Sequence, residues 1–218
     1  MSERPSPVHV VLASASPARK KLLHAAGIEP SIMVSGVDED AATAQAEETY
    51  GPLEPADLAL VLARAKAEDI APQCDEALVI GCDSILELDG DGHGKPQTPE
   101  QAIERWQLMR GRSGVLHTGH WLIDTREDDG TGATFGATAS TTVHFAAIDD
   151  DEIRAYVETG EPLRVAGSFT LDGLGAPFVT GIEGDPSNVV GLSLPLLREL
   201  LGEVGIAWHT LRAPGIPT

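Results

Sequence analysis

Three cations follow one another early in the chain, at Arg19, Lys20 and Lys21. Just before them, Ser16 and Pro17 have the character of a helix N-cap and of a proline at the first helical position. Positive charge is unfavourable there, because a helix carries partial positive charge at its N-terminus. A bound anion would reverse this balance, since free backbone N–H groups and cations would then face one negative group. The segment therefore predicts an anion-binding site, with an ordinary capped helix and solvated cations as the alternative.

A carboxylate, Asp83, directly follows the apolar run 77–82, which is predicted to be a short buried strand. A carboxylate beside buried surface costs free energy unless something compensates for it, which favours a functional role over a structural turn. Other charged candidates have simpler alternatives. Glu39 stands in an acidic stretch typical of solvated charge, and Lys66 is within reach of an acidic residue one helical turn later. Lys95 follows a glycine-rich turn, whose geometry alone can explain it.

Helices and strands alternate along the chain, and some neighbouring strands are predicted to pair with each other. The class that follows is α/β, with a mixed, partly antiparallel sheet flanked by helices. The acidic segment 38–55 has no clear period and many charges, so it is expected to be a mobile loop. Helices are expected over 16–27, 54–71, 98–111, 149–160 and 194–205, and strands over 8–13, 77–82, 114–124 and 137–148.

The composition limits the number of domains and the kinds of partner. The 218 residues are 42% hydrophobic, which predicts a single domain over 1–218, with its core at about 8–203 and loose tails at 1–7 and 212–218. Fifteen Lys and Arg residues against 34 Asp and Glu residues give a net charge of −19. This charge argues against a nucleic-acid polymer or an anionic membrane as partner. An anionic substrate would need locally placed cations, with a divalent metal as a further aid.

The sequence also lacks the signals of export. No stretch approaches about 18 consecutive apolar residues, the length of a membrane span. The initial segment MSERPSP is not followed by the apolar stretch of a secretory signal. The two cysteines, Cys74 and Cys82, do not have metal-site spacing and are expected to be buried reduced thiols. A cytoplasmic location is therefore expected.

Five longer segments stand in order along the chain, namely LASASPARKKLLHAAGI, ARAKAEDIA, IGCDSILELDGDGHGKP, TGEPLRVAGSFTLDGLG and IEGDPSNVVGLSLPLL. They resemble the successive motifs of the Maf nucleoside triphosphate pyrophosphatases, and the resemblance extends from about residue 8 to residue 201. It implies an elongated α/β fold with two lobes around a cleft, similar to that of the inosine triphosphate pyrophosphatases. It also implies hydrolysis of a nucleoside triphosphate to the monophosphate and pyrophosphate.

The resemblance implies a substrate-binding role for four polar residues. Ser16 and Arg19 would bind phosphate, Lys66 would lie in the cleft, and Lys95 would lie near the triphosphate. Because Arg19 is expected in the first turn of a helix, its removal should leave the ligand-free protein as stable as before, or more stable.

The same resemblance implies a divalent metal, Mg²⁺ or Mn²⁺, held by Glu39 and Asp83. Asp83 would also accept the proton of the water that attacks the α-phosphorus. Such a reaction depends on an oriented nucleophile and on neutralisation of the leaving pyrophosphate, mostly by positioning and electrostatics. Two carboxylates and a few cations around the phosphates meet these needs.

Recognition of the base is left open by the same comparison. Family members that prefer dTTP and UTP carry Arg, Thr and Gln at three positions, and those that prefer 7-methyl-GTP carry Trp, Gln and Glu. This chain has Ala18, Ser84 and Asp172 there. Asp172 resembles the purine-type acidic residue and Ser84 the pyrimidine-type hydroxyl, so both base classes stay open. The small Ala18 implies a broader or different pocket.

Two other functions are alternatives for this chain. One is an enzyme like the inosine triphosphate pyrophosphatases, which removes damaged or non-standard purine nucleotides. The other is a non-enzymatic nucleotide-binding regulator, since the family is associated with inhibition of septum formation and so with cell division. The intact set of Arg19, Lys66, Asp83 and Lys95 favours an enzyme. A homodimer is expected for a soluble enzyme of this size.

Overall fold

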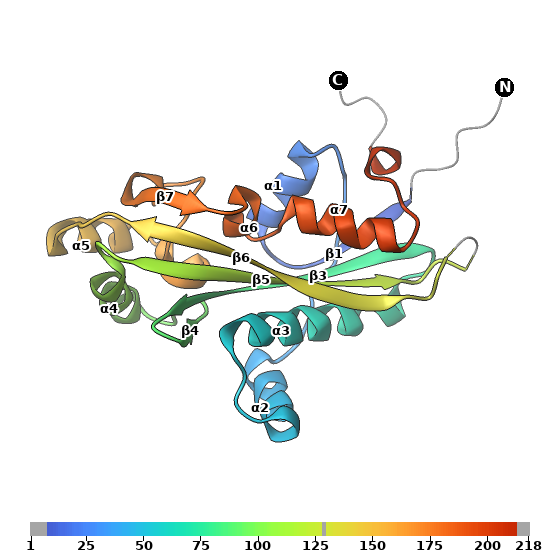
Figure 1. Ribbon diagram of the computed structural model, residues 1–218, viewed down its shortest axis with the longest axis horizontal. Helices are drawn as coiled ribbons and strands as arrows, with labels where there is room; N and C mark the ends of the chain where they lie inside the picture. Colours follow the sequence, from blue (N-terminus) through green and yellow to red (C-terminus); the bar gives the residue numbers. More distant parts are fainter. Residues whose placement is uncertain (1–7, 128–129, 213–218) are drawn as a thin grey trace.

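The computed structural model describes residues 8–127 and 130–212. Its centre is a seven-stranded sheet in the order β2-β1-β3-β5-β6-β7, with β4 paired to β3 (Figure 1). β1 runs parallel to β2 and β3, and the other pairings of the described strands are antiparallel. The predicted α/β class with a mixed sheet is therefore confirmed. The strands are β1 (His9–Ala13), β2 (Ser31–Ile32), β3 (Ala77–Leu88), β4 (Asp91–His93), β5 (Ser113–Asp124), β6 (Thr134–Phe145) and β7 (Val179–Glu183).

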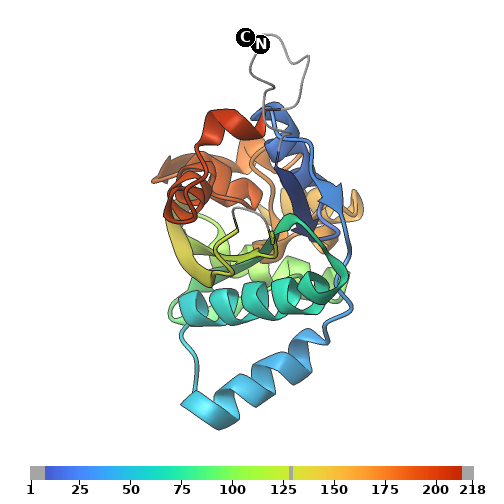
Figure 2. The same cartoon turned by 90° about the vertical axis from the view of Figure 1, so that its right-hand side faces the viewer.

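Helices cover both faces of this sheet. In Figure 1, α3 and α2 lie on one face, α1, α6 and α7 lie on the other, and α4 and α5 lie near one end. In Figure 2, α2 lies beyond α3, further from the sheet. No helix in the described ranges is long and apolar enough to cross a membrane. The helices are α1 (Pro17–Ala25), α2 (Glu39–Tyr50), α3 (Pro55–Ile70), α4 (Pro99–Met109), α5 (Asp150–Glu158), α6 (Pro186–Val190) and α7 (Leu194–Glu203).

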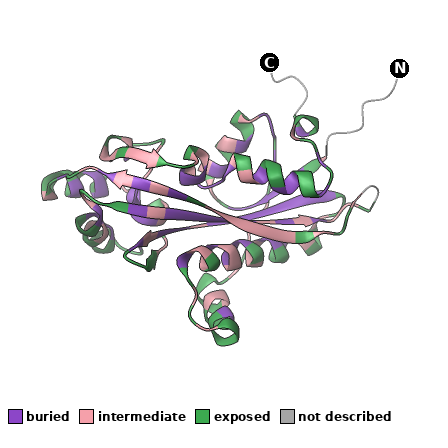
Figure 3. Ribbon diagram, in the orientation of Figure 1, coloured by how far each residue is buried: buried purple, intermediate pink, exposed green. Residues whose placement is uncertain are grey.

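Two buried apolar clusters lie toward opposite ends of the long central strands. One contains Leu78 of β3 and Leu122 of β5, and the other contains Leu86 of β3 and Leu116 of β5. Figure 3 shows that β3 is buried over most of its length, whereas much of α2 is exposed. Both clusters lie on the face of the sheet that carries Ser84, whereas Asp83 lies on the opposite face, between Val79 and Ile85 of two smaller buried clusters.

The strand β3 has an open stretch along one edge. On the side away from β5, β1 pairs with residues 77–81 of β3, and β4 pairs with residues 86–88. None of the described strands pairs with residues 82–85 on that side. Successive side chains on a strand point to opposite faces of the sheet. Asp83 and Ser84 are therefore presented on the two faces at this open edge.

Two glycines let α3 lie close on the sheet. A Cβ atom at Gly81 of β3 would lie 2.1 Å from the carbonyl oxygen of Ala63. A Cβ atom at Gly119 of β5 would lie 2.2 Å from the carbonyl oxygen of Ala59. No side chain fits at either position unless the helix moves. Because Gly119 is the register partner of Asp83, this contact sets the distance of α3 from the strand that carries the carboxylate.

The segment 38–55, which is expected to be a mobile loop, is a helix over most of its length. Its residues Glu39–Tyr50 form α2, and the carboxylate of Asp38 caps the helix by accepting a hydrogen bond from the Ala41 N–H (3.0 Å). Acidic residues in the first turn and several alanines favour a helix. Only Ala46 is buried, so the apolar period that usually indicates a helix is missing.

The other expected elements are present, with shifted boundaries. All five expected helices form, while β3 continues to Leu88 rather than ending at residue 82. β6 begins and ends three residues before the expected strand. Besides α2 and the short 3₁₀ helices, the elements that were not expected are β2, β4, β7 and α6, each of five residues or fewer, too short to show a period. Of the expected tails 1–7 and 212–218, all residues except the exposed Arg212 lie outside the described residues.

Candidate active site

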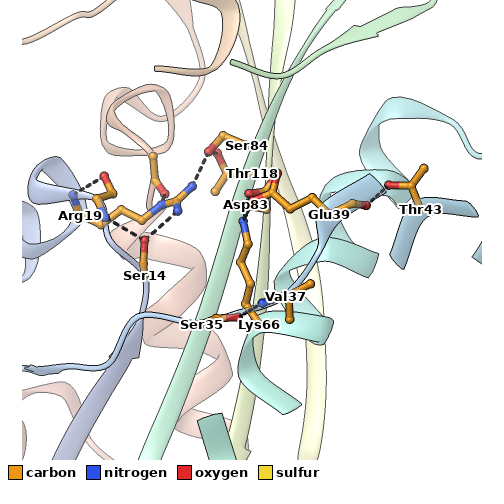
Figure 4. A network of polar contacts seen from close by, with 12 residues as sticks. Ser14, Arg19, Ser35, Val37, Glu39, Thr43, Lys66, Asp83, Ser84 and Thr118 are labelled. Carbon is orange, nitrogen blue, oxygen red and sulfur yellow. Dashed lines mark hydrogen bonds and ion pairs between the residues drawn. The ribbon is translucent and has the colours of Figure 1, made fainter. Parts of the chain in front are cut away.

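The buried side chain of Arg19 has only neutral partners. It lies in the first turn of α1, where Ser16 Oγ accepts a hydrogen bond from its backbone N–H (3.4 Å). Its guanidinium donates to the carbonyl oxygen of Gly191 (2.6 Å), to Ser14 Oγ (3.1 Å) and to Ser84 Oγ (3.0 Å) (Figure 4). Within the described residues it forms no ion pair. A buried cation without a counter-ion is unfavourable, so this arrangement fits a site that binds an anion.

The other two cations of the N-terminal run do not share this position. Lys20 is exposed. Lys21 Nζ forms an exposed ion pair with Asp172 Oδ2 (3.4 Å). Of the three cations, only Arg19 is therefore buried at the predicted anion site. The ion pair with Lys21 places Asp172 beside α1.

On the other face of the sheet, two carboxylates converge on one ammonium group. Lys66 Nζ of α3 donates to Asp83 Oδ1 of β3 (2.5 Å) and lies 2.7 Å from Glu39 Oε1, at the start of α2 (Figure 4). The side chains of Lys66 and Asp83 are 13% and 12% exposed, so their charges are largely desolvated and interact strongly. The alternative surface pair of Lys66 is not formed, because Asp69 instead accepts a hydrogen bond from the Gly36 N–H (2.9 Å).

These two groups of residues face the same open stretch of β3. Arg19 reaches it through Ser84 on one face of the sheet, and Lys66 reaches it through Asp83 on the other (Figure 4). Because the edge has no strand partner along residues 82–85, a ligand lying across it would be within reach of both groups. The structure thus brings together Ser16, Arg19, Glu39, Lys66, Asp83 and Ser84.

Three of the sequence-predicted residues stand apart from this group. Lys95 is exposed in the loop between β4 and α4, and in the described part of the chain its side chain has no hydrogen bond or ion pair. Asp172 is paired with Lys21 on the surface of α1. Ala18 precedes Lys21 by three residues and so lies on the same helix face. Ser84, by contrast, is bound to the buried guanidinium of Arg19, and within the described residues it has no hydrogen bond to Asp172.

Sequence reasoning missed the polar residues behind the site. Thr118 Oγ1 lies 2.9 Å from Ser84 Oγ and donates to the carbonyl oxygen of Asn188 (3.2 Å). His120 Nδ1 donates to the carbonyl oxygen of Thr118 (2.9 Å), and its Nε2 accepts a hydrogen bond from the Ser193 N–H (2.8 Å). These bonds tie β3 and β5 to α6, through Asn188, and to the N-cap of α7, through Ser193. The sequence signal that could have revealed them was the presence of polar residues, Thr118 and His120, within an otherwise apolar strand.

Comparison with known proteins decides the family. Residues 9–204 match the model of a family described as Maf-like protein. The chain belongs to the Maf family. Its relatives include proteins named nucleoside triphosphate pyrophosphatase from Salinispora tropica, 56% identical over 97% of this chain and 91% of theirs, and from Streptomyces coelicolor, 55% identical over 94% and 95%. A third, from Mycobacterium ulcerans, is 50% identical over 94% of this chain and 96% of its own.

In this Maf protein, Glu39 and Asp83 supply carboxylate oxygen atoms, the type of ligand that a divalent cation prefers. Both approach one point, which the ammonium group of Lys66 occupies. Mg²⁺ prefers carboxylate oxygen atoms and usually keeps water and phosphate ligands as well. No cluster of three or more His, Cys, Asp or Glu side chains that could hold a metal occurs among the described residues.

Burial keeps His120 of this Maf protein neutral. Desolvation lowers the pKa of His120 from 6.5 to about 4, and the positive charge of Arg19 adds to the shift, although the hydrogen bond to Thr118 opposes it. The two hydrogen bonds of the ring select the tautomer that is protonated at Nδ1. His120 is therefore a neutral structural group that holds Ser193 at the start of α7.

We expect the free energy of unfolding to fall as the pH is lowered from 6.5 toward 4. The unfolded chain binds a proton on His120 at the ordinary pKa, and the folded protein binds it only near pH 4. This contribution is thus complete above pH 6.5 and is lost as the pH falls through the folded pKa, in total about 3 kcal/mol. Urea unfolding at a series of pH values measures the slope.

A His120→Gln variant, which does not titrate in this range, should show a smaller slope than the wild type. A His209→Gln variant, at an exposed position, should keep the wild-type slope. Equal slopes in His120→Gln and the wild type would mean that other groups cause the pH dependence.

Proposed function

We propose that this protein hydrolyses nucleoside triphosphates to the monophosphate and pyrophosphate. The observation that carries the proposal is the buried guanidinium of Arg19, which lacks an anionic partner within the described residues and faces the same open strand edge as Asp83. A triphosphate would supply the missing negative charge, and the carboxylate would supply a proton acceptor for water. The relatives named nucleoside triphosphate pyrophosphatase support the same reaction.

The side chains of this chain can bind and orient the reacting groups. Lys66 holds Asp83 Oδ1, while Asp83 Oδ2 has no hydrogen-bond partner in the described ranges and can accept a proton from the attacking water. Arg19 and the N-terminus of α1, capped by Ser16, would bind phosphate oxygen atoms and offset charge on the leaving pyrophosphate. Lys95 would reach the triphosphate from its exposed loop.

We also propose that Glu39 and Asp83 hold a divalent cation, Mg²⁺ or Mn²⁺, when the nucleotide binds. Such a cation polarises phosphate oxygen atoms and offsets their charge. The net charge of −19 supports this role, because the protein has few cations of its own to spare for a triphosphate. The ammonium group of Lys66 would then contact phosphate as well as the carboxylates.

Incubation with a nucleoside triphosphate and Mg²⁺ should release monophosphate and pyrophosphate in equal amounts. In water labelled with ¹⁸O, the label should appear in the monophosphate, because water attacks the α-phosphorus. Excess EDTA should lower the rate at least about 100-fold. Anion-exchange chromatography measures the products and the rate with and without EDTA, and mass spectrometry locates the ¹⁸O label. Orthophosphate and a nucleoside diphosphate as main products would contradict the reaction, whereas full turnover in EDTA would contradict only the metal.

Recognition of the base is proposed to involve Asp172 and Ala18, which share the side of α1 that carries Lys21. Ser84 would act mainly on the phosphate side, because its hydroxyl binds Arg19. An acidic residue at the base can accept hydrogen bonds from ring N–H or amino groups, so Asp172 would favour bases that present such donors.

We propose a cytoplasmic location and a homodimer. Cys74 and Cys82 are free thiols, as is usual in a reducing compartment. Homodimers are the commonest assemblies among soluble enzymes of this size. Size-exclusion chromatography with light scattering would test the assembly, and a mass equal to that of one chain would contradict it.

A further inference from the structure

The loop 170–175, which carries Asp172, is held by hydrogen bonds to one carboxylate, that of Glu161. This residue follows α5 and precedes a short turn of 3₁₀ helix over 162–164. Two of its four hydrogen-bond donors are backbone N–H groups of the loop, and the other two are hydroxyl groups. The donors to Oε1 are Tyr156 Oη (2.9 Å), Thr170 Oγ1 (2.6 Å) and the Gly175 N–H (3.0 Å), and the donor to Oε2 is the Leu174 N–H (3.0 Å).

The loop backbone lies directly against this carboxylate. A Cβ atom at Gly173 would lie 2.6 Å from Glu161 Oε2. A Cβ atom at Gly175 would lie 2.4 Å from Tyr156 Oη. At Gly175 the Cβ atom would also lie 2.8 Å from the backbone nitrogen of Thr170, so a side chain there would displace the loop itself. At Gly173 the nearest atoms belong to the side chains of Glu161 and Thr170, so a side chain there would push the carboxylate aside.

The anchor depends on the negative charge of Glu161. Burial raises the pKa of this carboxyl, but the hydrogen-bond donors together lower it further, so the pKa lies below its ordinary value and the group is ionised. Burial raises the pKa of Tyr156, which keeps the phenol neutral and able to donate. Glu161 forms no ion pair with a cation in the described part of the chain, so neutral donors alone hold it.

Asp172 itself has little to hold it in place. Its one ion pair, with Lys21 (3.4 Å), is solvent-exposed at both ends, with side chains 37% and 73% exposed. An exposed pair of this kind contributes little free energy. Thr170, Leu174 and Gly175 flank Asp172 on both sides and are all bound to Glu161. The position of Asp172 over α1 therefore depends more on Glu161 than on Lys21.

We propose that Glu161 is a positioning residue for nucleotide selection. It fixes the loop 170–175 and so the position of Asp172 beside α1, without touching the nucleotide. The inference rests on the proposed function and on the base contact of Asp172. Its consequence is that Glu161 should influence which nucleotide is preferred more than how fast the preferred one is hydrolysed.

Two variants of Glu161 and one control separate this role from general stability. Glu161→Gln keeps the size of the side chain but turns an amino group toward a backbone N–H or hydroxyl donor. Glu161→Ala removes all four acceptor contacts. The matched control is Glu158→Gln on α5, which is exposed and has no hydrogen bond or ion pair within the described residues.

The first readout is the ratio of kcat/KM for GTP to that for UTP. This ratio should change about fivefold or more in Glu161→Gln and further in Glu161→Ala, mainly through KM. The kcat for the preferred nucleotide should stay within about twofold, since no group that touches the reacting atoms changes. The Glu158→Gln control should match the wild type.

The second readout is a double-mutant cycle with Asp172→Asn. The double variant Glu161→Gln with Asp172→Asn should have the same GTP to UTP ratio as Asp172→Asn alone, because positioning has no effect once the carboxylate is gone. Hydrogen exchange at the amides of Leu174 and Gly175 should be at least about tenfold faster in Glu161→Gln.

Other results would overturn the inference. An unchanged ratio, with turnover of both nucleotides reduced equally, would make Glu161 a structural residue only. Additive effects in the double variant would mean that it does not act through Asp172. If the wild type releases no pyrophosphate from any nucleotide, the proposed function fails. The GTP-induced and UTP-induced shifts in melting temperature then replace the kinetic ratio, and equal shifts in Glu161→Gln and wild type would overturn the positioning role.

Discussion

Replacement of Asp83 by asparagine should lower turnover at least about 100-fold. Asparagine keeps the size of the side chain but cannot accept a proton from water or supply negative charge to a metal. The fold should tolerate the change, because the amide oxygen can still accept the hydrogen bond from Lys66, whose charge remains paired with Glu39. Stability should fall by no more than about 1 kcal/mol. Pyrophosphate release and thermal unfolding, measured on the same preparation, check both expectations.

A buried carboxylate with a structural role offers a matched control. Asp124, at the end of β5, accepts hydrogen bonds from Arg126 and Thr131, and its side chain is fully buried. Burial raises the pKa of Asp124, but these hydrogen bonds lower it well below its ordinary value. Asp124→Asn should therefore cost stability, about 2 kcal/mol, while turnover per folded molecule stays the same. If Asp83→Asn instead behaved like this control, the proton acceptor would lie elsewhere, with Glu39 the next candidate.

Removal of the Arg19 side chain should weaken both nucleotide binding and the ligand-free fold. In Arg19→Ala, loss of a buried charge-assisted contact with phosphate should raise the dissociation constant of a non-hydrolysable nucleoside triphosphate by about 10-fold to 100-fold. The position of Arg19 in the helix alone predicts that its removal leaves stability unchanged or raises it. That expectation does not take into account the hydrogen bonds of the guanidinium to Ser14, Ser84 and Gly191. Loss of these bonds should lower the free energy of unfolding by about 2 kcal/mol. Calorimetric titration and urea unfolding measure the two effects.

The neighbouring cations show whether the effect is specific to Arg19. Lys20→Ala removes an exposed charge from the same helix and should leave stability unchanged or slightly higher, with little effect on nucleotide binding. Lys21→Ala is a less clean control, because it also breaks the ion pair between Lys21 and Asp172. Equal losses of affinity in all three variants would indicate general electrostatic attraction rather than a bound phosphate at Arg19.

Local signals were sufficient to predict most of the helices. Caps and prolines at the N-terminus marked α1 and α4, and an apolar period marked α3. The same approach failed for α2, because its single buried residue, Ala46, leaves no period. The signals that remained, the cap Asp38 and several alanines, are weaker than periodicity. This failure matters for the site, since α2 carries Glu39.

Side-chain partners of the candidate site could not be predicted, because they depend on contacts between distant segments. Arg19 was expected at an anion site, but one of its hydrogen-bond acceptors is the carbonyl oxygen of Gly191, which lies 172 residues further along the chain. The role of Ser84 at the base stays a prediction, and the hydrogen bond between its hydroxyl and Arg19 could not be predicted from the sequence. The open edge of β3 also depends on where β1 ends and β4 begins. Local sequence patterns carry no information about such pairings.

Asp83 and Ser84 point to opposite faces of the sheet, so mutations that change the length of β3 should not be tolerated. An insertion or deletion of one residue earlier in the strand would exchange the two side chains between faces, because the side-chain period of a strand is two. The carboxylate would then point toward α1 and the hydroxyl toward Lys66. A substitution on this strand alters one side chain at a time, whereas a single-codon length change would disable both halves of the site. Length variation should therefore be confined to turns such as Asp89–Gly90, between β3 and β4.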